Sequence, residues 1–246
     1  MIYINPDYKG IFHEFKLVET KEMMEFFQSG EMVSASSISR LWKKKLGEEM
    51  LYAKKYESTY SLRYFCRRSR GMREFLAYRF FQSCGIPGPV VVYFEEKRLL
   101  GNLLWSFLVT QNIDSTVDLF SFFEKRPANG HLRQKIMESL AKIAWQIHSC
   151  GFYHKDFKLR NILLSTIEES NPKLYLIDCP KSVQKKSFSP RLALWDIVTL
   201  YKHTSFLCTP AEWQIFMDVY AKERGCDVNR LSQDMLRRYT KKFGRQ

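Results

Sequence analysis

The stretch GFYHKDFKLRNILL, residues 151–164, decides the fold of this chain. It places His154, Asp156, Lys158 and Asn161 within eight residues, between two apolar runs. The glycine at its start is typical of a helix end, and the closing NILL is typical of a short apolar strand. We therefore predict a loop between a helix and a strand, on which the polar side chains can face a ligand.

The composition is that of a globular chain. The 246 residues are 45% hydrophobic and 15% aromatic, which suits one large domain or two modest lobes. No apolar run reaches the roughly 18–20 residues that cross a bilayer, and residues 1–16 lack the pattern of a secretory signal. We therefore expect a cytoplasmic chain. Its six cysteines are scattered without a C-x-x-C pair, which favours reduced thiols over a zinc site.

The charge is strongly basic. The formal net charge is +13, from 39 Lys and Arg against 26 Asp and Glu. Such a balance attracts polyanions, and nucleic acid, an anionic membrane face or a phosphorylated substrate would each fit. No RNP-like aromatic motif, zinc finger or helix-turn-helix spacing is present in the sequence, so we expect no nucleic-acid partner.

Hydrophobic patterning divides the chain into a strand-rich half, residues 1–112, and a helix-rich half, residues 113–246. In the first half, apolar runs between turn residues predict strands, with one main helix ended by the sequence GIPGP. In the second half, 115–125 predicts a helix with a Ser or Thr cap, and 131–151 predicts a longer one. We predict an α+β fold with a small β-rich lobe and a helical lobe, and a ligand cleft between them.

The polar residues of the opening stretch suit phosphoryl transfer. Asp156 can accept a proton from a hydroxyl, and Lys158 can neutralise charge on a phosphoryl group. Asn161 offers a hard oxygen suited to Mg²⁺. Asp178 stands seventeen residues further on, after an apolar strand, where its carboxylate could hold the same metal ion. A base with two oxygen ligands on neighbouring loops is the working set for this chemistry.

These residues carry a resemblance to known kinases. HKDFKLRN resembles the protein-kinase catalytic loop H-R-D-x-x-x-x-N, and LIDC stands where such kinases have D-F-G. Over about residues 30–205 the chain is similar to the bacterial lipopolysaccharide kinase family, which includes the Kdo and core-heptose kinases. The similar segments are AKKY, REFLAYRFFQSCGIP, HKDFKLRNILL and LIDCPKS.

The resemblance implies a two-lobed protein-kinase-like fold and an ATP- and Mg²⁺-dependent kinase. Its acceptor would be a sugar hydroxyl, on heptose or Kdo, of the lipopolysaccharide inner core. This anionic glycolipid suits the +13 charge and implies peripheral contact with the cytoplasmic face of the inner membrane.

The resemblance also implies roles for residues in the first half. Lys54, held by Glu74, would position the α- and β-phosphates of ATP. Lys55 is the alternative, because neighbouring lysines on a strand point to opposite faces. No G-x-G-x-x-G is present in the sequence, so Ser36 and Ser37 would cover the phosphates, unless their turn is an ordinary hairpin.

Adenine would lie against a hinge at 109–112, which includes Thr110 and Gln111.

In the second half, the resemblance makes Asp178 and Asn161 the Mg²⁺ ligands. Asp156 would orient the acceptor hydroxyl and take its proton, and Lys158 would contact the γ-phosphate. His154 is expected to be structural support rather than the general base.

Further along the second half, Asp196 would anchor the backbone of the catalytic loop from below. The basic cluster that follows Asp178 would either bind the substrate or be a solvated loop; its members are Lys181, Lys185, Lys186 and Arg191.

Alternative functions remain open at this point. A protein Ser/Thr kinase or a small-molecule kinase of the aminoglycoside or choline type would use the same fold. A pseudokinase acting as a binding module is suggested by SASSIS in place of the glycine loop and DCP in place of D-F-G. Retention of Asp156, Asn161, Asp178 and a strand lysine argues against the pseudokinase.

Overall fold

The computed structural model forms two compact units. The first unit comprises residues 1–83 and 89–113, and the second comprises 84–88 and 114–246. Strands dominate the first unit and helices the second, so the predicted α+β class is confirmed. The residues described are 1–57, 64–65, 67–125, 130–165 and 172–244.

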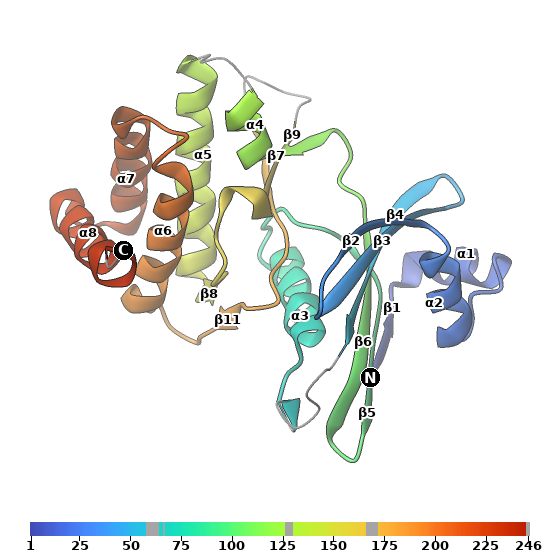
Figure 1. Ribbon diagram of the computed structural model, residues 1–246. Helices are drawn as coiled ribbons and strands as arrows, with labels where there is room; N and C mark the ends of the chain where they lie inside the picture. The colour runs from blue at the N-terminus through green and yellow to red at the C-terminus, as the bar shows by residue number, and fades with distance from the viewer. Residues whose placement is uncertain (58–63, 66, 126–129, 166–171, 245–246) are drawn as a thin grey trace. The chain divides into compact units, whose positions relative to one another are not determined.

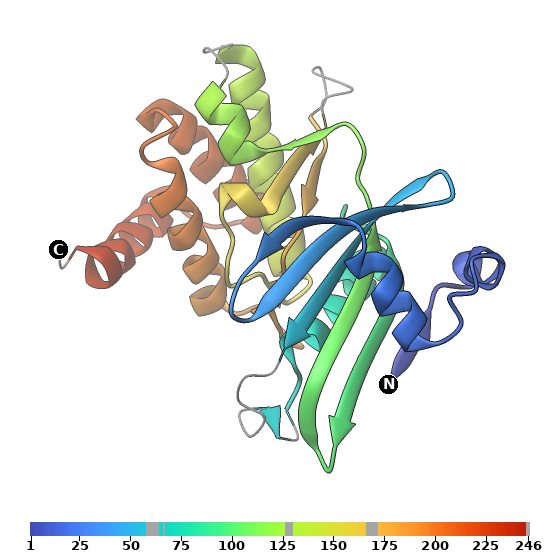
Figure 2. The same ribbon diagram turned by 45° about the vertical axis from the view of Figure 1, so that its right-hand side comes forward.

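The first unit is built on an antiparallel six-stranded sheet with the order β1-β5-β6-β4-β3-β2 (Figure 2). Five of these strands fall on segments whose patterning predicts strands, and β1 was not predicted. The strands are β1 (Ile2–Ile4), β2 (Glu31–Ala35), β3 (Ser39–Leu46), β4 (Glu49–Glu57), β5 (Val91–Leu99) and β6 (Asn102–Gln111).

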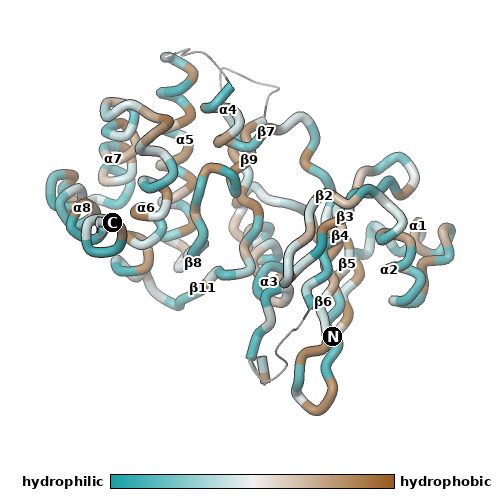
Figure 3. The backbone as a smooth tube through the Cα atoms, in the orientation of Figure 1, coloured by the Kyte–Doolittle hydropathy of each residue, from teal (hydrophilic) through white to brown (hydrophobic). Residues whose placement is uncertain are grey.

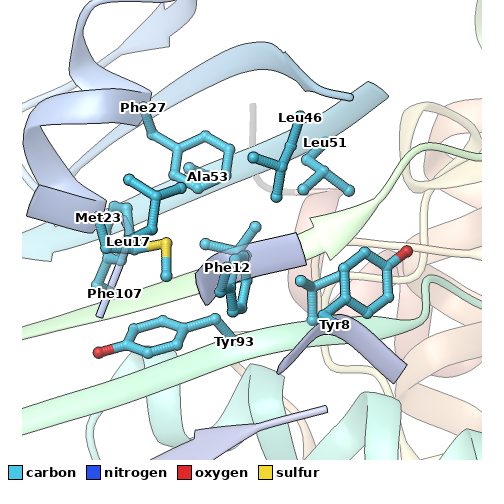
Figure 4. Close-up of a cluster of buried hydrophobic side chains, with 12 residues drawn as sticks. Tyr8, Phe12, Leu17, Met23, Phe27, Leu46, Leu51, Ala53, Tyr93 and Phe107 are labelled. Atoms are coloured by element: carbon cyan, nitrogen blue, oxygen red, sulfur yellow. The ribbon is translucent and has the colours of Figure 1, made fainter. Parts of the chain in front are cut away.

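One face of this sheet is covered by the N-terminal helices (Figure 1). The short turn η1 (Pro6–Tyr8) leads into α1 (Lys9–Glu14), and α2 (Thr20–Gln28) follows. The cluster on the sheet contains Phe12 of α1, Met23 and Phe27 of α2, and Tyr93 and Phe107 of the sheet (Figure 4). Burial of each such side chain contributes about 1.5–3 kcal/mol, so this cluster fixes the helices on the sheet.

The opposite face is covered by α3 (Arg70–Ser83). A Cβ on Gly71 would lie 2.2 Å from Ser106 Oγ, so only glycine allows the helix to approach β6 this closely. One turn later, Phe75 stacks on Phe94 of β5 with ring centroids 4.5 Å apart. These contacts hold Glu74, between them, over the sheet.

The second unit is mainly helical. Its helices are α4 (Leu119–Lys125), α5 (Gly130–Ser149), α6 (Pro190–Thr204), α7 (Pro210–Arg224) and α8 (Val228–Phe243), with a short turn η3 (Leu159–Asn161). Its strands form two small antiparallel sheets, β10-β9-β7 and β11-β8. They are β7 (Thr116–Asp118), β8 (Phe152–Tyr153), β9 (Ile162–Ser165), β10 (Leu174–Leu176) and β11 (Val183–Gln184).

The predicted start of the helix at 115–125 is wrong. Residues 116–118 pair with β9 as β7, and α4 begins only at Leu119. Asp118 provides the cap instead of a serine or threonine, because its carboxylate accepts hydrogen bonds from Ser121 N–H and Oγ at 3.0 and 2.7 Å.

The core of the second unit lies along α5. Its apolar residues at helical spacing are buried as predicted, namely Ile136, Leu140, Ile143, Ala144 and Ile147. Unlike α5, α8 consists largely of hydrophilic residues (Figure 3). None of the helices in the part of the chain that the structure describes is long and apolar enough to cross a membrane.

Candidate active site

The loop that carries Asp156 is held from below by α6. Asp196 of α6 is fully buried, and its two carboxylate oxygens accept hydrogen bonds from the backbone N–H groups of His154 and Lys155, at 2.7 and 2.8 Å. Lys155 has φ 64°, a left-handed conformation that is unfavourable for a lysine. Asp196 is therefore hydrogen-bonded where the loop backbone is strained.

His154 joins this loop to the strand end that precedes Asp178. Its ring is fully buried, Nε2 lies 3.0 Å from the carbonyl oxygen of Ile177, and the ring packs on Phe157. A neutral ring with its proton on Nε2 would donate to that carbonyl. A fully buried ring in this position suits support of the loop better than proton transfer with a substrate.

His148 is a buried neighbour of Asp196 that the sequence reasoning missed. Its Nε2 lies 3.5 Å from Asp196 Oδ2, and its Nδ1 lies 2.8 Å from the hydroxyl of Tyr220. This histidine near the end of α5 therefore packs beside the Asp196 carboxylate in the interior of the second unit. In the sequence it has only the appearance of a helix-terminal residue.

Two lysines flank the carboxylate of Asp156. The ammonium groups of Lys158 and Lys181 each lie 3.3 Å from Asp156 Oδ2. Because both lysines contact Oδ2, the second carboxylate oxygen, Oδ1, can accept a hydrogen bond from the hydroxyl of a substrate. The arrangement combines an acceptor for a proton with two positive charges beside it.

Asn161 and Asp178 are placed close together by the backbone. The Asn161 side-chain amide donates from Nδ2 to the carbonyl oxygen of Asp156 at 2.9 Å, which fixes the side chain on the loop. The N–H of Ile177, just before Asp178, donates to the Asn161 carbonyl at 3.0 Å. An amide oxygen and a carboxylate are hard ligands that fit Mg²⁺.

Additional metal ligands are not supplied by a larger cluster. No group of three or more His, Cys, Asp and Glu side chains suited to a metal ion occurs among the described residues. Mg²⁺ usually keeps few protein ligands and completes its shell with water and phosphate oxygens, so one amide oxygen and one carboxylate are the kind of ligand set that it takes.

The structure separates the four basic residues that follow Asp178. Lys181 contacts Asp156, whereas Lys185 and Lys186 are exposed and Arg191 lines a pocket between α6 and α8. The backbone at Lys185 passes close to Gly151, which has φ 73°. A Cβ at this position would lie 2.2 Å from the Lys185 carbonyl oxygen, so only glycine allows this approach.

His203 is a further titratable group near Asp156 that sequence reasoning missed. Burial lowers its pKa below the ordinary value, and the positive charges of Lys158 and Lys202 lower it further, while Asp156 acts in the opposite direction. Its position at the end of α6, far from the catalytic motif in sequence, gave no signal.

In the first unit, Lys54 and not Lys55 contacts Glu74. Lys54 Nζ lies 3.3 Å from a carboxylate oxygen of Glu74, which is 2% exposed, and Lys55 Nζ lies 3.5 Å from Glu57. The hydroxyls of Tyr56 and Tyr78 also donate to Glu74. The carboxylate is thus held by three donors, and only Lys54 has the geometry expected of the ATP lysine.

The remaining predicted nucleotide-binding residues lie at the ends of strands in the first unit. Ser36 Oγ accepts the N–H groups of Ile38 and Ser39 at 3.2 and 3.1 Å, which closes a tight hairpin turn with Ser37 exposed. Thr110 and Gln111 end β6 and are partly exposed. The Ser36 hydroxyl is therefore engaged within the turn, as are the backbone N–H groups of Ser36, Ile38 and Ser39.

Comparisons with known proteins identify relatives of this chain. A family model described as "Lipopolysaccharide kinase (Kdo/WaaP) family" matches residues 20–220. A curated relative, lipopolysaccharide core heptose(I) kinase WaaP of Pseudomonas aeruginosa, is 25% identical over 135 residues, which are 52% of this chain and 50% of that protein. The chain thus matches about half the length of this relative.

The fold also has a solved counterpart. The structure described as WaaP in complex with acyl carrier protein superposes with a TM-score of 0.77 and 19% identity, and the match covers 99% of both chains. At this identity the likeness shows the fold alone. The family match at residues 20–220 extends over both units and covers well over half of the chain, and the chain therefore belongs to the lipopolysaccharide kinase (Kdo/WaaP) family, a family of kinases.

Proposed function

We propose that this protein transfers the γ-phosphoryl group of ATP to a sugar hydroxyl, on heptose or Kdo, of the lipopolysaccharide inner core. The observation that carries the proposal is the carboxylate of Asp156 with Lys158 and Lys181 on one of its oxygens. The free side of this carboxylate accepts the acceptor hydroxyl, and the two ammonium groups neutralise the phosphoryl group as charge develops on it.

The loop geometry supports the same proposal. Phosphoryl transfer needs positioning more than covalent chemistry, and the backbone around Asp156 is fixed by Asp196, His154 and Asn161. We propose that Asp156 orients the hydroxyl and takes its proton late in the transfer.

Nucleotide and metal binding complete the proposed mechanism. Lys54, fixed by Glu74, would contact the α- and β-phosphates, and the turn at Ser36 and Ser37 would cover them. Asn161 and Asp178 would hold Mg²⁺, which would supply positive charge to neutralise the phosphate oxygens. Thr110 and Gln111 would face adenine.

The acceptor class is supported by family membership and by the charge of the chain. The curated relative is a core heptose kinase, and the net charge of +13 suits an anionic glycolipid. We propose that the protein acts at the cytoplasmic face of the membrane, where such an acceptor would be presented, through peripheral electrostatic contact.

The test is an assay of ATP consumption and phosphate incorporation with purified lipopolysaccharide core acceptors. We expect acceptor-dependent turnover that falls by about 10³-fold or more in Asp156→Ala and in Asp178→Ala. Asp218→Asn, on the exposed side of α7, is the matched control and should retain wild-type activity.

Each other outcome has a defined meaning. Full activity in Asp156→Ala or Asp178→Ala would contradict the assignment of the site. Autophosphorylation with no sugar acceptor would favour a protein kinase, and tight Mg-ATP binding without turnover on any acceptor would favour a pseudokinase.

A further inference from the structure

A basic pocket lies between α6 and α8 of the second unit, and the mechanism above does not use it. It has a volume of about 450 Å³. Arg191 and Trp195 of α6 line it on one side, and Arg238, Lys241 and Lys242 of α8 line it on the other. We call these five residues the α6–α8 pocket.

The indole ring of Trp195 organises the cations. Lys242 Nζ lies 3.6 Å from its ring centroid, Lys155 Nζ 4.0 Å and the Arg238 guanidinium carbon 5.5 Å. Such contacts are attractive and hold positive groups together that would otherwise repel one another. The ring is thus engaged by cations, which leaves it poorly suited to stack on a nucleic-acid base.

The positive charge of the pocket has little compensation from carboxylates. No Asp or Glu occurs among the described residues that line it. The negative charge of Asp196 acts on Lys155 and Lys242 in the direction that raises their pKa, but its two oxygens are engaged by the loop backbone. Within the part of the chain that is described, Arg238 Nε is buried and has no hydrogen-bond partner.

The ionisation of the lysines reflects this surplus of charge. Burial lowers the pKa of Lys242, and the neighbouring positive charges of Lys155, Lys202 and Arg238 lower it further. Burial likewise lowers the pKa of Lys155, with Arg238 and Arg191 acting in the same direction. A bound anion would relieve this repulsion, so the pocket is electrostatically prepared for one.

We propose that the α6–α8 pocket binds a phosphate-bearing group, either on a phosphorylated sugar or in a phospholipid headgroup. A guanidinium group can donate two parallel hydrogen bonds to two oxygens of one phosphate. The neighbouring ammonium groups add positive charge that matches a phosphate dianion. The volume admits a phosphorylated monosaccharide or a headgroup. The site is separate from the residues proposed to bind ATP and does not depend on the proposed reaction.

Binding can be measured on the full chain without nucleotide, by isothermal titration calorimetry. One arm uses glucose 1,6-bisphosphate and the other uses phosphatidylcholine vesicles with and without phosphatidylglycerol. The test variant is Lys241→Gln/Lys242→Gln, which removes two charges of the pocket and keeps polar side chains in the last turn of α8. Lys142→Gln/Lys222→Gln removes the same charge from exposed positions outside the pocket.

We expect the pocket variant to weaken phosphate binding by about tenfold or more and the control to stay within about twofold of wild type. Loss confined to the sugar phosphate identifies a soluble or glycosidic phosphate as the ligand, and loss confined to the anionic vesicles identifies a headgroup. Equal binding by wild type, pocket variant and control in both arms would overturn the proposal.

A second measurement guards against an unfolding artefact. Trp195→Phe removes the best cation–π partner but keeps an aromatic ring, so it should weaken binding without loss of fold, judged by the thermal midpoint. Since no ATP is present, failure of this test would leave the proposed phosphotransfer untouched, and a failed kinase assay would leave the pocket untouched.

Discussion

The carboxylate of Asp196 accepts a hydrogen bond of 2.7 Å from the backbone N–H of His154, which ties α6 to the loop of Asp156. In Asp196→Asn, one of the two loop N–H donors faces an amide N–H₂ instead of an oxygen. We expect a loss of about 1–3 kcal/mol in the free energy of unfolding and a lower kcat. Urea unfolding and ATP turnover check this.

The control for that variant is Asp234→Asn on α8, which loses only a pair with Arg237 at the surface. It should match wild type in both measurements. Unchanged stability in Asp196→Asn would show that the anchoring hydrogen bonds contribute little.

The two lysines of β4 should differ sharply when substituted. Lys54→Met removes the partner of Glu74, and we expect kcat/KM for ATP to fall by about 10²-fold. Lys55→Met removes only a pair with Glu57 and should change kcat/KM by less than about threefold. Steady-state kinetics with varied ATP measure both. Equal losses would contradict the assignment of Lys54.

The ion pair of Arg133 with Glu212 should control stability at low pH. Hydrogen bonding to Arg133 is the largest cause that lowers the pKa of Glu212 below its ordinary value. Because the folded-state pKa is lowered, the ionised Glu212 stabilises the fold above the unfolded pKa of about 4.5. This stabilisation is lost as the pH falls through the folded-state pKa. Glu212→Gln should therefore flatten the stability–pH curve below about pH 5.

Removal of only one partner of this pair should be more harmful than removal of both. Arg133→Met leaves a buried carboxylate uncompensated, which costs about 3 kcal/mol or more, and Arg133→Met/Glu212→Leu should recover much of that loss. Denaturant unfolding of wild type and of these two variants gives the comparison. A double variant that is less stable than Arg133→Met would contradict this account.

His203 should titrate below the ordinary histidine range. Its pKa is lowered by burial and then by Lys158, so His203 stays neutral at pH 7, and Lys158→Gln should raise its midpoint. NMR titration of the ring protons measures the shift. Substitution of a remote lysine, Lys142→Gln, should leave the midpoint unchanged.

The catalytic loop was predictable because its residues are close in sequence. His154, Asp156 and Asn161 lie on one short loop, so the spacing alone placed them together, and Asp178 followed from the apolar strand before it. The choice between Lys54 and Lys55 was left open by the alternation of a strand. The choice between the two lysines depends on where α3 places Glu74, and that position depends on the close approach of Gly71 to β6.

The features that sequence reasoning missed depend on contacts between distant elements. The α6–α8 pocket joins Trp195 to Lys242 across two helices, and of its five residues only Arg191 was a predicted substrate-binding candidate. The cap of α4 was misplaced because Ser115 and Thr116 are typical caps, whereas pairing with β9 drew Thr116 into a strand. Tertiary pairing overrode the local preference there.

The pairing of β1 with β5 has a practical consequence for shortened chains. The family match begins at residue 20, but Tyr3 pairs with Phe94 and Phe12 fills the cluster on the sheet. A recombinant protein trimmed to the matched residues would expose the backbone edge of β5 and an apolar face, both of which invite aggregation. We therefore expect soluble expression to depend on a segment that lies outside the matched residues.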